Sequence, residues 1–414
     1  MKPVKYSFKY IVIILLYQFL PDIAYSYAQD TWSLERCIGH ALLNNLQIKE
    51  QKLSIEEAQN SVLQAKLSFI PSVDLSVNYN SQIQNTSAEF SASMPLLRGF
   101  SKTNILKSNK VQLQIMQSAA KKLENDITIS ITQAFLQILL SKEIYKCAQE
   151  SYNSVSMQVV RTRKLVEAGS QAYSTLLDIQ AQLANERVQF ITASNDVKNS
   201  TLALSQLLDL SKNQDFTIEI PKNIGPLPDT LDGNMEALYS CALSLPQIRS
   251  AELELEKSRY DYKIQKGAFY PSVSLSFSKL DGNGRATVGL NMSISIFNGW
   301  HAGCAAKNAL LNIRKNELYL EKQPQQLYNE IVQAYTDASD AYEKYLAAQQ
   351  NMNANRESFN HVVQKFNIGM LESTDYIVAK TNLSRAESEY YRAKFQYLFQ
   401  LKLLDFYKGI PITL

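Results

Sequence analysis

Glycine and proline are scarce in this sequence, which has 13 and 11 of them among 414 residues. Neither residue occurs from Phe100 to Ala168 or from Ser170 to Ile220. Because these residues are the usual helix breakers, their absence predicts very long helices. A helix of about 69 residues is about 100 Å long, whereas a compact domain of this size is only about 55 Å across. The sequence therefore predicts an elongated molecule.

Cysteine and histidine are also scarce, which removes most metal and redox chemistry. The 4 cysteines include no CxxC pair, and they are Cys37, Cys147, Cys241 and Cys304. Each lies in a helical context, which favours a small buried residue over a disulfide. The 3 histidines are His40, His301 and His361. They are far apart and lack the spacing of a metal site, and no Ser/His/Asp arrangement is present. The sequence therefore predicts neither an enzyme nor a bound cofactor.

Long apolar runs and an excess of one charge are missing as well. The net charge is +3 and charges of both signs are interleaved, so the sequence lacks the clustered basic residues that are typical of nucleic-acid binding. Its longest apolar run, Tyr10 to Leu20, is 11 residues, which is too short for a membrane-spanning helix. Three lysines precede this run, and Ser26-Tyr27-Ala28 follows it as a cleavage signal. Residues 1–28 are therefore interpreted as a signal peptide for export, and an uncleaved membrane anchor is the alternative.

What the chain does contain is a duplication. Phe-Ile-Pro-Ser-Val-Asp-Leu-Ser at 69–76 returns as Phe-Tyr-Pro-Ser-Val-Ser-Leu-Ser at 269–276, which is 200 residues later and identical at six of eight positions. The same offset relates Gly99 to Gly299 and Gly169 to Gly369. We therefore divide the chain into repeat 1 at 29–215, a linker at 216–229 and repeat 2 at 230–414.

Each repeat is predicted to contain a long antiparallel helical hairpin. Gly169 and Gly369 act as helix stops, and each is followed by a further helical run, at 175–210 and 374–407. Apolar residues before each glycine step by four and three, which is coiled-coil spacing. Pro324 is expected to kink the second long helix or to mark an excursion from it. Taken alone, these helices are also compatible with a soluble coiled-coil scaffold.

Four segments before the long helices have the period-two pattern of β-strands, at about 71–80, 88–97, 271–280 and 285–297. One face of each is apolar, as at Val73 and Leu75, and the other is mostly Ser, Asn and Gly. A length of about ten residues suits a tilted transmembrane strand. The Asp-Gly-Asn-Gly segment at 281–284 predicts a hairpin turn. A small soluble sandwich is the alternative use of such strands.

Four strands cannot close a membrane barrel, because the smallest such barrels have eight. Several chains must therefore contribute strands. Two chains would give a filled eight-stranded barrel and three chains a twelve-stranded barrel with a lumen. The small polar residues on the inward face favour the trimer.

Together these features resemble the TolC family of outer membrane efflux proteins. The resemblance rests on the duplicated Phe-x-Pro-Ser-Val motifs that lead into the strands, the segments 95–99 and 296–299 that lead out of them, and the hairpin tips at Gly169 and Gly369. It spans about residues 31–410. It implies a mainly helical homotrimer with duplicated long helical hairpins that form a periplasmic α-barrel. Four β-strands per chain would complete a twelve-stranded barrel in outer-membrane lipid. It also implies a passive exit duct that docks through a periplasmic adaptor (membrane fusion) protein with an inner-membrane pump, in tripartite efflux or type I secretion.

The resemblance also implies two functional places. Adaptor contacts fall on the hairpin tips, at Val166, Ala168, Gly169, Ser170, Asn367, Ile368, Gly369 and Met370. For the glycines, an ordinary helix-capping role is compatible with this. The periplasmic aperture falls on Asp375, Phe366, Leu371, Val378, Glu372 and Asp178. Only one of the family's two aspartates is kept, at Asp375, and Val378 stands at the other position. An apolar constriction is therefore an alternative to an acidic one.

Overall fold

The computed structural model describes residues 31–80, 85–210, 216–221, 227–228, 235–280 and 285–414. The predicted signal peptide and the predicted turn at 281–284 lie outside these residues. The predicted linker, 216–229, is described only in part.

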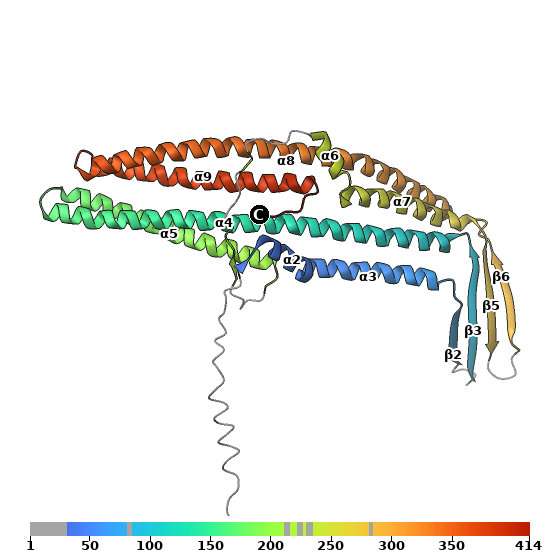
Figure 1. The fold of residues 1–414 in the computed structure, drawn as a ribbon. Helices are drawn as coiled ribbons and strands as arrows, with labels where there is room; N and C mark the ends of the chain where they lie inside the picture. Colours follow the sequence, from blue (N-terminus) through green and yellow to red (C-terminus); the bar gives the residue numbers. More distant parts are fainter. Residues whose placement is uncertain (1–30, 81–84, 211–215, 222–226, 229–234, 281–284) are drawn as a thin grey trace, which may run out of the picture.

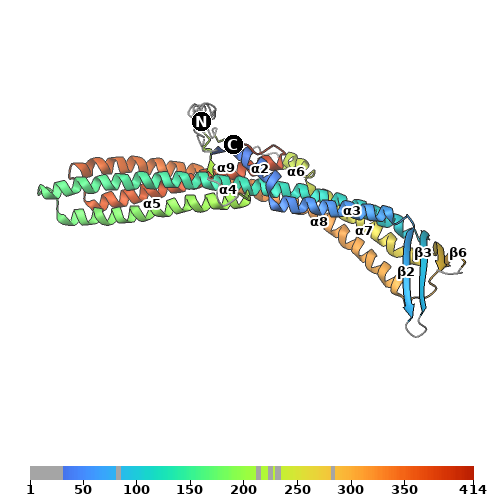
Figure 2. The same cartoon turned by 90° about the horizontal axis from the view of Figure 1, so that it is seen from below.

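Two helices, α4 (Ser101–Glu167) and α8 (His301–Asn367), run almost the whole length of the molecule, with 67 residues each (Figure 1). After each tip, a helix of 35 residues returns alongside: α5 (Tyr173–Leu207) against α4 and α9 (Ser373–Tyr407) against α8. The two predicted helical hairpins are confirmed. Pro324 does not end α8, so the predicted excursion is wrong. In Figure 2 both α4, which contains no proline, and α8 bend near mid-length, so the bend does not require Pro324.

Shorter helices complete the other half of the molecule. Helix α3 (Leu46–Leu67) packs on α4, and α7 (Pro246–Lys266) packs against both α4 and α8. Helices α2 (Leu34–Asn44) and α6 (Met235–Ala242) lie near mid-length, and a 3-10 turn, η1 (Gly267–Phe269), follows α7. Strands β1 (Thr31–Trp32) and β4 (Thr217–Ile218) form a small parallel pair, which the sequence did not predict. Among the described residues, none of the helices has the length and apolar character needed to cross a bilayer.

The four remaining strands form one antiparallel sheet at the end opposite the hairpin tips, in the order β2-β3-β5-β6 (Figure 1). They are β2 (Ser72–Asn80), β3 (Asn85–Arg98), β5 (Ser272–Leu280) and β6 (Thr287–Ser293). The fourth strand was predicted at 285–297 and is shorter. Its partner β5 begins at Ser272, opposite Ser293, so residues 294–297 have no strand beside them in this chain.

The register gathers the apolar side chains of all four strands on one face. Val73 pairs with Ala92, which pairs with Phe277, which pairs with Val288. The serines between them share the other face and form cross-strand hydrogen bonds, such as Ser278 with Thr287 at 3.0 Å. One detail differs from the predicted alternation: a register shift between Pro95 and Leu97 brings Leu97, rather than Leu96, opposite Val273.

The largest core cluster lies at mid-length, where α2, α4 and the ends of α5 and α9 meet. Ile131, Phe135 and Ile138 of α4 are almost fully buried there, and Ile131 and Ile138 are among the residues whose spacing predicted packed helices. Cys37 belongs to this core, and burial raises its pKa to about 12. Burial was predicted for all four cysteines, and it is wrong for Cys241 and Cys304, which are exposed on α6 and α8.

Candidate functional site

The two hairpin tips are built by the same backbone device. At each tip the glycine has a left-handed backbone, with φ of 72° at Gly169 and 77° at Gly369. The amides of Ser170 and Met370 donate to carbonyl oxygens five residues earlier, at 2.8 and 2.9 Å. Each helix therefore ends in a Schellman motif, which needs glycine because left-handed backbone is strained for other residues. A Cβ added to either glycine would contact nothing within 4 Å, so space is not the constraint.

Most residues predicted to contact an adaptor face solvent in the single chain. Ile368 and Met370 are 68% and 73% exposed, and Ala168 and Ser170 are exposed as well. Val166 and Asn367 are half-buried. The tips therefore differ in chemistry: the tip of repeat 1 is small and polar, whereas that of repeat 2 presents two large apolar side chains.

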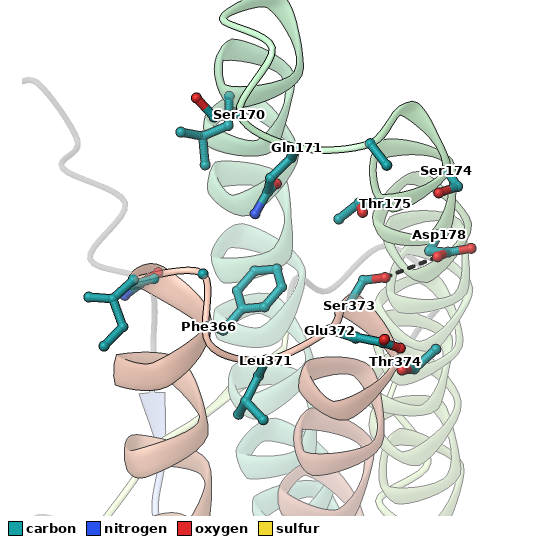
Figure 3. A pocket seen from close by; sticks show the side chains of 15 residues that line it. Ser170, Gln171, Ser174, Thr175, Asp178, Phe366, Leu371, Glu372, Ser373 and Thr374 are labelled. Atoms are coloured by element: carbon teal, nitrogen blue, oxygen red, sulfur yellow. Dashed lines mark hydrogen bonds between the residues drawn. The ribbon is translucent and has the colours of Figure 1, made fainter.

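A hollow of about 610 Å³ separates the two tips, and Figure 3 shows it between the ends of α4, α5, α8 and α9. Its walls are mostly hydroxyl, amide and carboxylate groups. Ser373 donates a hydrogen bond to Asp178 across this hollow at 3.0 Å. The Oε1 atom of Gln171 is buried and finds no hydrogen-bond partner among the described residues.

A second connection joins the repeats beside this hollow. The Arg161 guanidinium, on α4, donates to the side-chain oxygen of Asn367 at 2.6 Å and to its carbonyl at 3.1 Å. Arg161 was not among the residues predicted from the sequence. The two residues are 206 positions apart, so neither periodicity nor local spacing could relate them.

The predicted aperture residues fall into two groups. Asp375, Glu372 and Val378 are exposed on the first turns of α9 or just before it, with Val378 at 58%. Asp178, on α5, is exposed as well, although Ser373 holds its carboxylate by the hydrogen bond across the hollow.

Phe366 and Leu371 form the second group, which is more buried. Phe366 is 2% exposed and packs with Val155, Val159 and Tyr376 in a cluster that joins the two hairpins. Leu371 is half-buried against the same cluster. Both side chains also border the hollow between the tips, beside Asp178 and Glu372. Burial of most of the Phe366 ring between the hairpins is favourable because it removes apolar surface from water.

A buried polar seam, which was not predicted from the sequence either, lies beyond this cluster. Lys380 on α9 is 6% exposed, and its ammonium lies 5.3 Å from the Phe359 ring centroid. Burial lowers the pKa of Lys380, while the nearby charge of Glu186 partly opposes the shift. Glu186, on α5, is itself 5% exposed and accepts a hydrogen bond from Gln182 at 2.7 Å. Charged side chains of both repeats are therefore enclosed between the hairpins.

Among the described residues, no group of three or more His, Cys, Asp and Glu side chains is placed to hold a metal ion. The fold instead places the four-stranded sheet at one end and the paired tips at the other.

Comparison with known proteins decides the family. The sequence matches the outer membrane efflux protein family over residues 37–209 and 238–409, which are the two repeats. The chain belongs to this family. Solved structures agree on the fold: a crystal structure of CusC superposes with a TM-score of 0.77 at 16% identity, covering 92% of both chains. The CmeC outer membrane channel of Campylobacter jejuni gives 0.75 at 17% identity, covering 91% of this chain and 85% of that one.

Curated relatives are distant. AprF of Pseudomonas aeruginosa, an alkaline protease secretion protein, is 20% identical over 69% of this chain and 62% of its own length. PrtF of Dickeya chrysanthemi, a protease secretion protein, is 20% identical over 66% of this chain and 62% of its own length. The chain thus spans about three fifths of these two relatives. The outer membrane protein TolC of Salmonella enteritidis is 19% identical over 88% of this chain and 79% of its own length. Family membership confirms the predicted fold class and the predicted location in the outer membrane, with the helices in the periplasm.

Proposed function

We propose that three copies of this chain form a passive exit duct through the outer membrane, for efflux or for type I secretion. The observation that carries the proposal is the sheet, which is incomplete in one chain. Its outer strands, β2 and β6, each have one edge without a partner among the described residues. An exposed strand edge is a template for pairing with another chain.

The apolar face of the sheet supports a place in lipid. Leu75, Val288 and Leu290 are 70%, 72% and 67% exposed, and no described element covers them. A soluble sandwich would bury this face against a second apolar layer. A soluble or peripheral coiled-coil scaffold, the rival function, leaves it unexplained.

The duplication supplies a register for pairing between chains. Within the chain, β3 of repeat 1 pairs with β5 of repeat 2, so that Ser93 lies opposite Ser276. The counterpart of Ser93 in repeat 2 is Ser293, and the counterpart of Ser276 in repeat 1 is Ser76. If the same pairing is used between chains, β6 pairs with β2 of the next chain, with Ser293 opposite Ser76. The same rule places Ile294 opposite Leu75. Residues 294–297, unpaired here, would then gain a partner strand, and three chains would close twelve strands.

The remaining functional places follow from this assembly. The helices would extend the duct into the periplasm, and the tips would meet a periplasmic adaptor that links the duct to an inner-membrane pump. The exposed positions of Asp375 and Glu372 suit a ring of carboxylates at the periplasmic aperture. The pump would supply the energy for transport.

Two measurements test the function. Sodium carbonate should leave the protein in the membrane fraction while detergent releases it, whereas a peripheral scaffold would be released by carbonate. Purified protein in planar lipid bilayers should then give discrete conductance steps. Release by carbonate together with an absence of conductance would overturn the proposal.

A further inference from the structure

A second hollow lies at the opposite end of the molecule, where the helices meet the sheet. Its volume is about 650 Å³, and its walls come from α3, α4, the end of α7 and the first residues of the sheet. Ser272, Ser293 and Arg98 belong to the polar face, because Arg98 pairs with Ser272 and Ser272 with Ser293. In the proposed duct this face lines the lumen, so the hollow would open to it.

Two cations reach this hollow. The guanidinium of Arg98 is exposed there, and the structure shows no ion pair for it among the described residues. The ammonium of Lys102, the second residue of α4, donates to the carbonyl oxygen of Ser68 and keeps two further N–H donors. Burial and the charge of Arg98 lower the pKa of Lys102. The two charges thus lie close enough to repel each other.

Nothing negative compensates these charges locally. The lining residues include no Asp and no Glu. They include hydroxyl groups instead, among them Ser293 and Ser295. The hydroxyls of Ser101 and Ser272 also line the hollow but donate to the carbonyl oxygens of Arg98 and Ser293. The first turn of α4 has no side-chain cap, so its free amides add positive potential at the same place. Guanidinium, ammonium and hydroxyl groups together form the donor set that binds phosphate or carboxylate.

Repeat 2 shows that the fold does not require these charges. The counterparts of Arg98 and Lys102, 200 residues later, are Asn298 and Ala302. Both repeats nevertheless pass from strand to helix in the same way, through a left-handed glycine and a left-handed aromatic residue: Gly99 and Phe100, Gly299 and Trp300. A cation pair present in only one of two equivalent junctions calls for an explanation other than folding.

The geometry points to an anion-binding collar at the base of the barrel, formed by Arg98 and Lys102, that takes phosphate or carboxylate groups of molecules in the lumen. With three chains, three such pairs would surround the axis. The collar's part in export rests on the proposed duct, but anion binding by the hollow does not. Its selectivity is opposite to that expected at the acidic aperture.

Inorganic pyrophosphate is a suitable probe. Equilibrium dialysis with the detergent-purified protein should show saturable binding that weakens as salt is added. Replacing Arg98→Asn and Lys102→Ala copies the residues of repeat 2, so the variant should fold and should bind at least tenfold more weakly. The matched control is Lys66→Gln, which removes an exposed lysine of α3 that does not line the hollow. Binding that is absent in the native protein, or equal in the native protein and the double variant, would overturn the collar.

A conductance experiment tests the anion-binding collar and the proposed duct separately. In bilayers made only of zwitterionic lipid, pyrophosphate should reduce the current of the native protein and leave that of the double variant unchanged. The absence of anionic lipid excludes headgroups with a net negative charge as the bound species, and the phosphate of the zwitterionic lipid is the same in both forms of the protein. A protein that conducts but shows equal block in both forms contradicts the collar alone. A protein that does not conduct contradicts the duct, and dialysis still decides the collar.

Discussion

Repeat 1 and repeat 2 agree in their backbones far more closely than in their side chains. The long helices α4 and α8 have 67 residues each, the return helices α5 and α9 have 35 each, and β2 and β5 have 9 each. Left-handed residues stand at equivalent positions, such as Gly169 and Gly369. These shared features are the ones that backbone geometry demands.

Charged and large side chains, by contrast, are rarely shared. Arg98 corresponds to Asn298, Asp178 to Val378, Arg161 to His361 and Lys380 to Gln180. Two of these residues, Arg161 and Asp178, bond across from repeat 1 to repeat 2. The contrast shows that the duplicated scaffold fixes the path of the chain, while the unshared side chains connect the repeats. In the proposed duct, they would also set the chemistry of the lumen.

The largest expected effect tests a shared feature, the apolar face of the sheet. Leu75→Arg in repeat 1 and Leu290→Arg in repeat 2 should each cost about 2 to 4 kcal/mol, because a charge would face lipid. Ser76→Arg and Ser276→Arg, on the polar face, should be tolerated. The measurement is the amount of assembled protein in outer membranes. Equal losses for both sets would show that the two faces are not lipid-facing and water-facing.

The next effect concerns the shared glycines. Gly169→Ala, Gly369→Ala and Gly409→Ala should each cost about 1 to 2 kcal/mol in unfolding free energy, because all three have positive φ and open space around the added Cβ. Thermal unfolding measures this cost.

Gly409, at the end of α9, has the same backbone motif but lies away from the tips, so it is the control for function. Gly169→Glu and Gly369→Glu should abolish export with the trimer still present in the membrane, whereas Gly409→Glu should leave export intact. If the tip variants lose the trimer, their glycines serve folding only.

The sequence predicted most of the shared features and few of the unshared ones. Helix lengths, strands and glycine tips follow from local rules. Gly169 was therefore sufficient to predict a hairpin tip, and the alternation around Leu75 was sufficient to predict a strand. Phe366 borders the hollow between the tips, but its packing against Val155 and Val159 of the other repeat was not predicted. Such a contact depends on how two hairpins lie against each other, and no spacing within one helix encodes it.

A smaller effect is expected for the hydrogen bonds from Arg161 to Asn367, which connect the repeats and have no counterpart at the equivalent positions among the described residues. Arg161→Ala and Asn367→Ala should each destabilise the tip region by about 1 kcal/mol, and the double variant should cost little more than either, because one interaction is lost in each. Hydrogen exchange of the amides near residue 370 should become faster. Additive losses in this double-mutant cycle would mean that the two residues act independently.

The smallest effect on stability is expected at the exposed aperture positions. Asp375→Asn should change unfolding free energy by less than about 0.5 kcal/mol, since this surface carboxylate has no ion pair among the described residues. It should nevertheless weaken cation preference and block by divalent metal ions in single-channel recordings. Val378→Asp, which introduces the charge that repeat 1 carries at Asp178, should strengthen both. Unchanged selectivity in Asp375→Asn would show that the aperture is not acidic.

The central claim is that chains join edge to edge, β6 to β2, in the register that the duplication supplies. Within one chain these two strands are separated by β3 and β5, about 14 Å apart, so a disulfide between them can form only between chains. In a background where the exposed Cys241 and Cys304 are replaced by serine, Ser76→Cys combined with Ser293→Cys tests the claim on non-reducing gels after mild oxidation. We expect covalent dimers and trimers that reduction reverses. We expect far less cross-linking for Val77→Cys with Ser293→Cys, whose side chains would point to opposite faces. No intermolecular bond from the first pair, or equal bonding by both pairs, would contradict the edge-to-edge assembly.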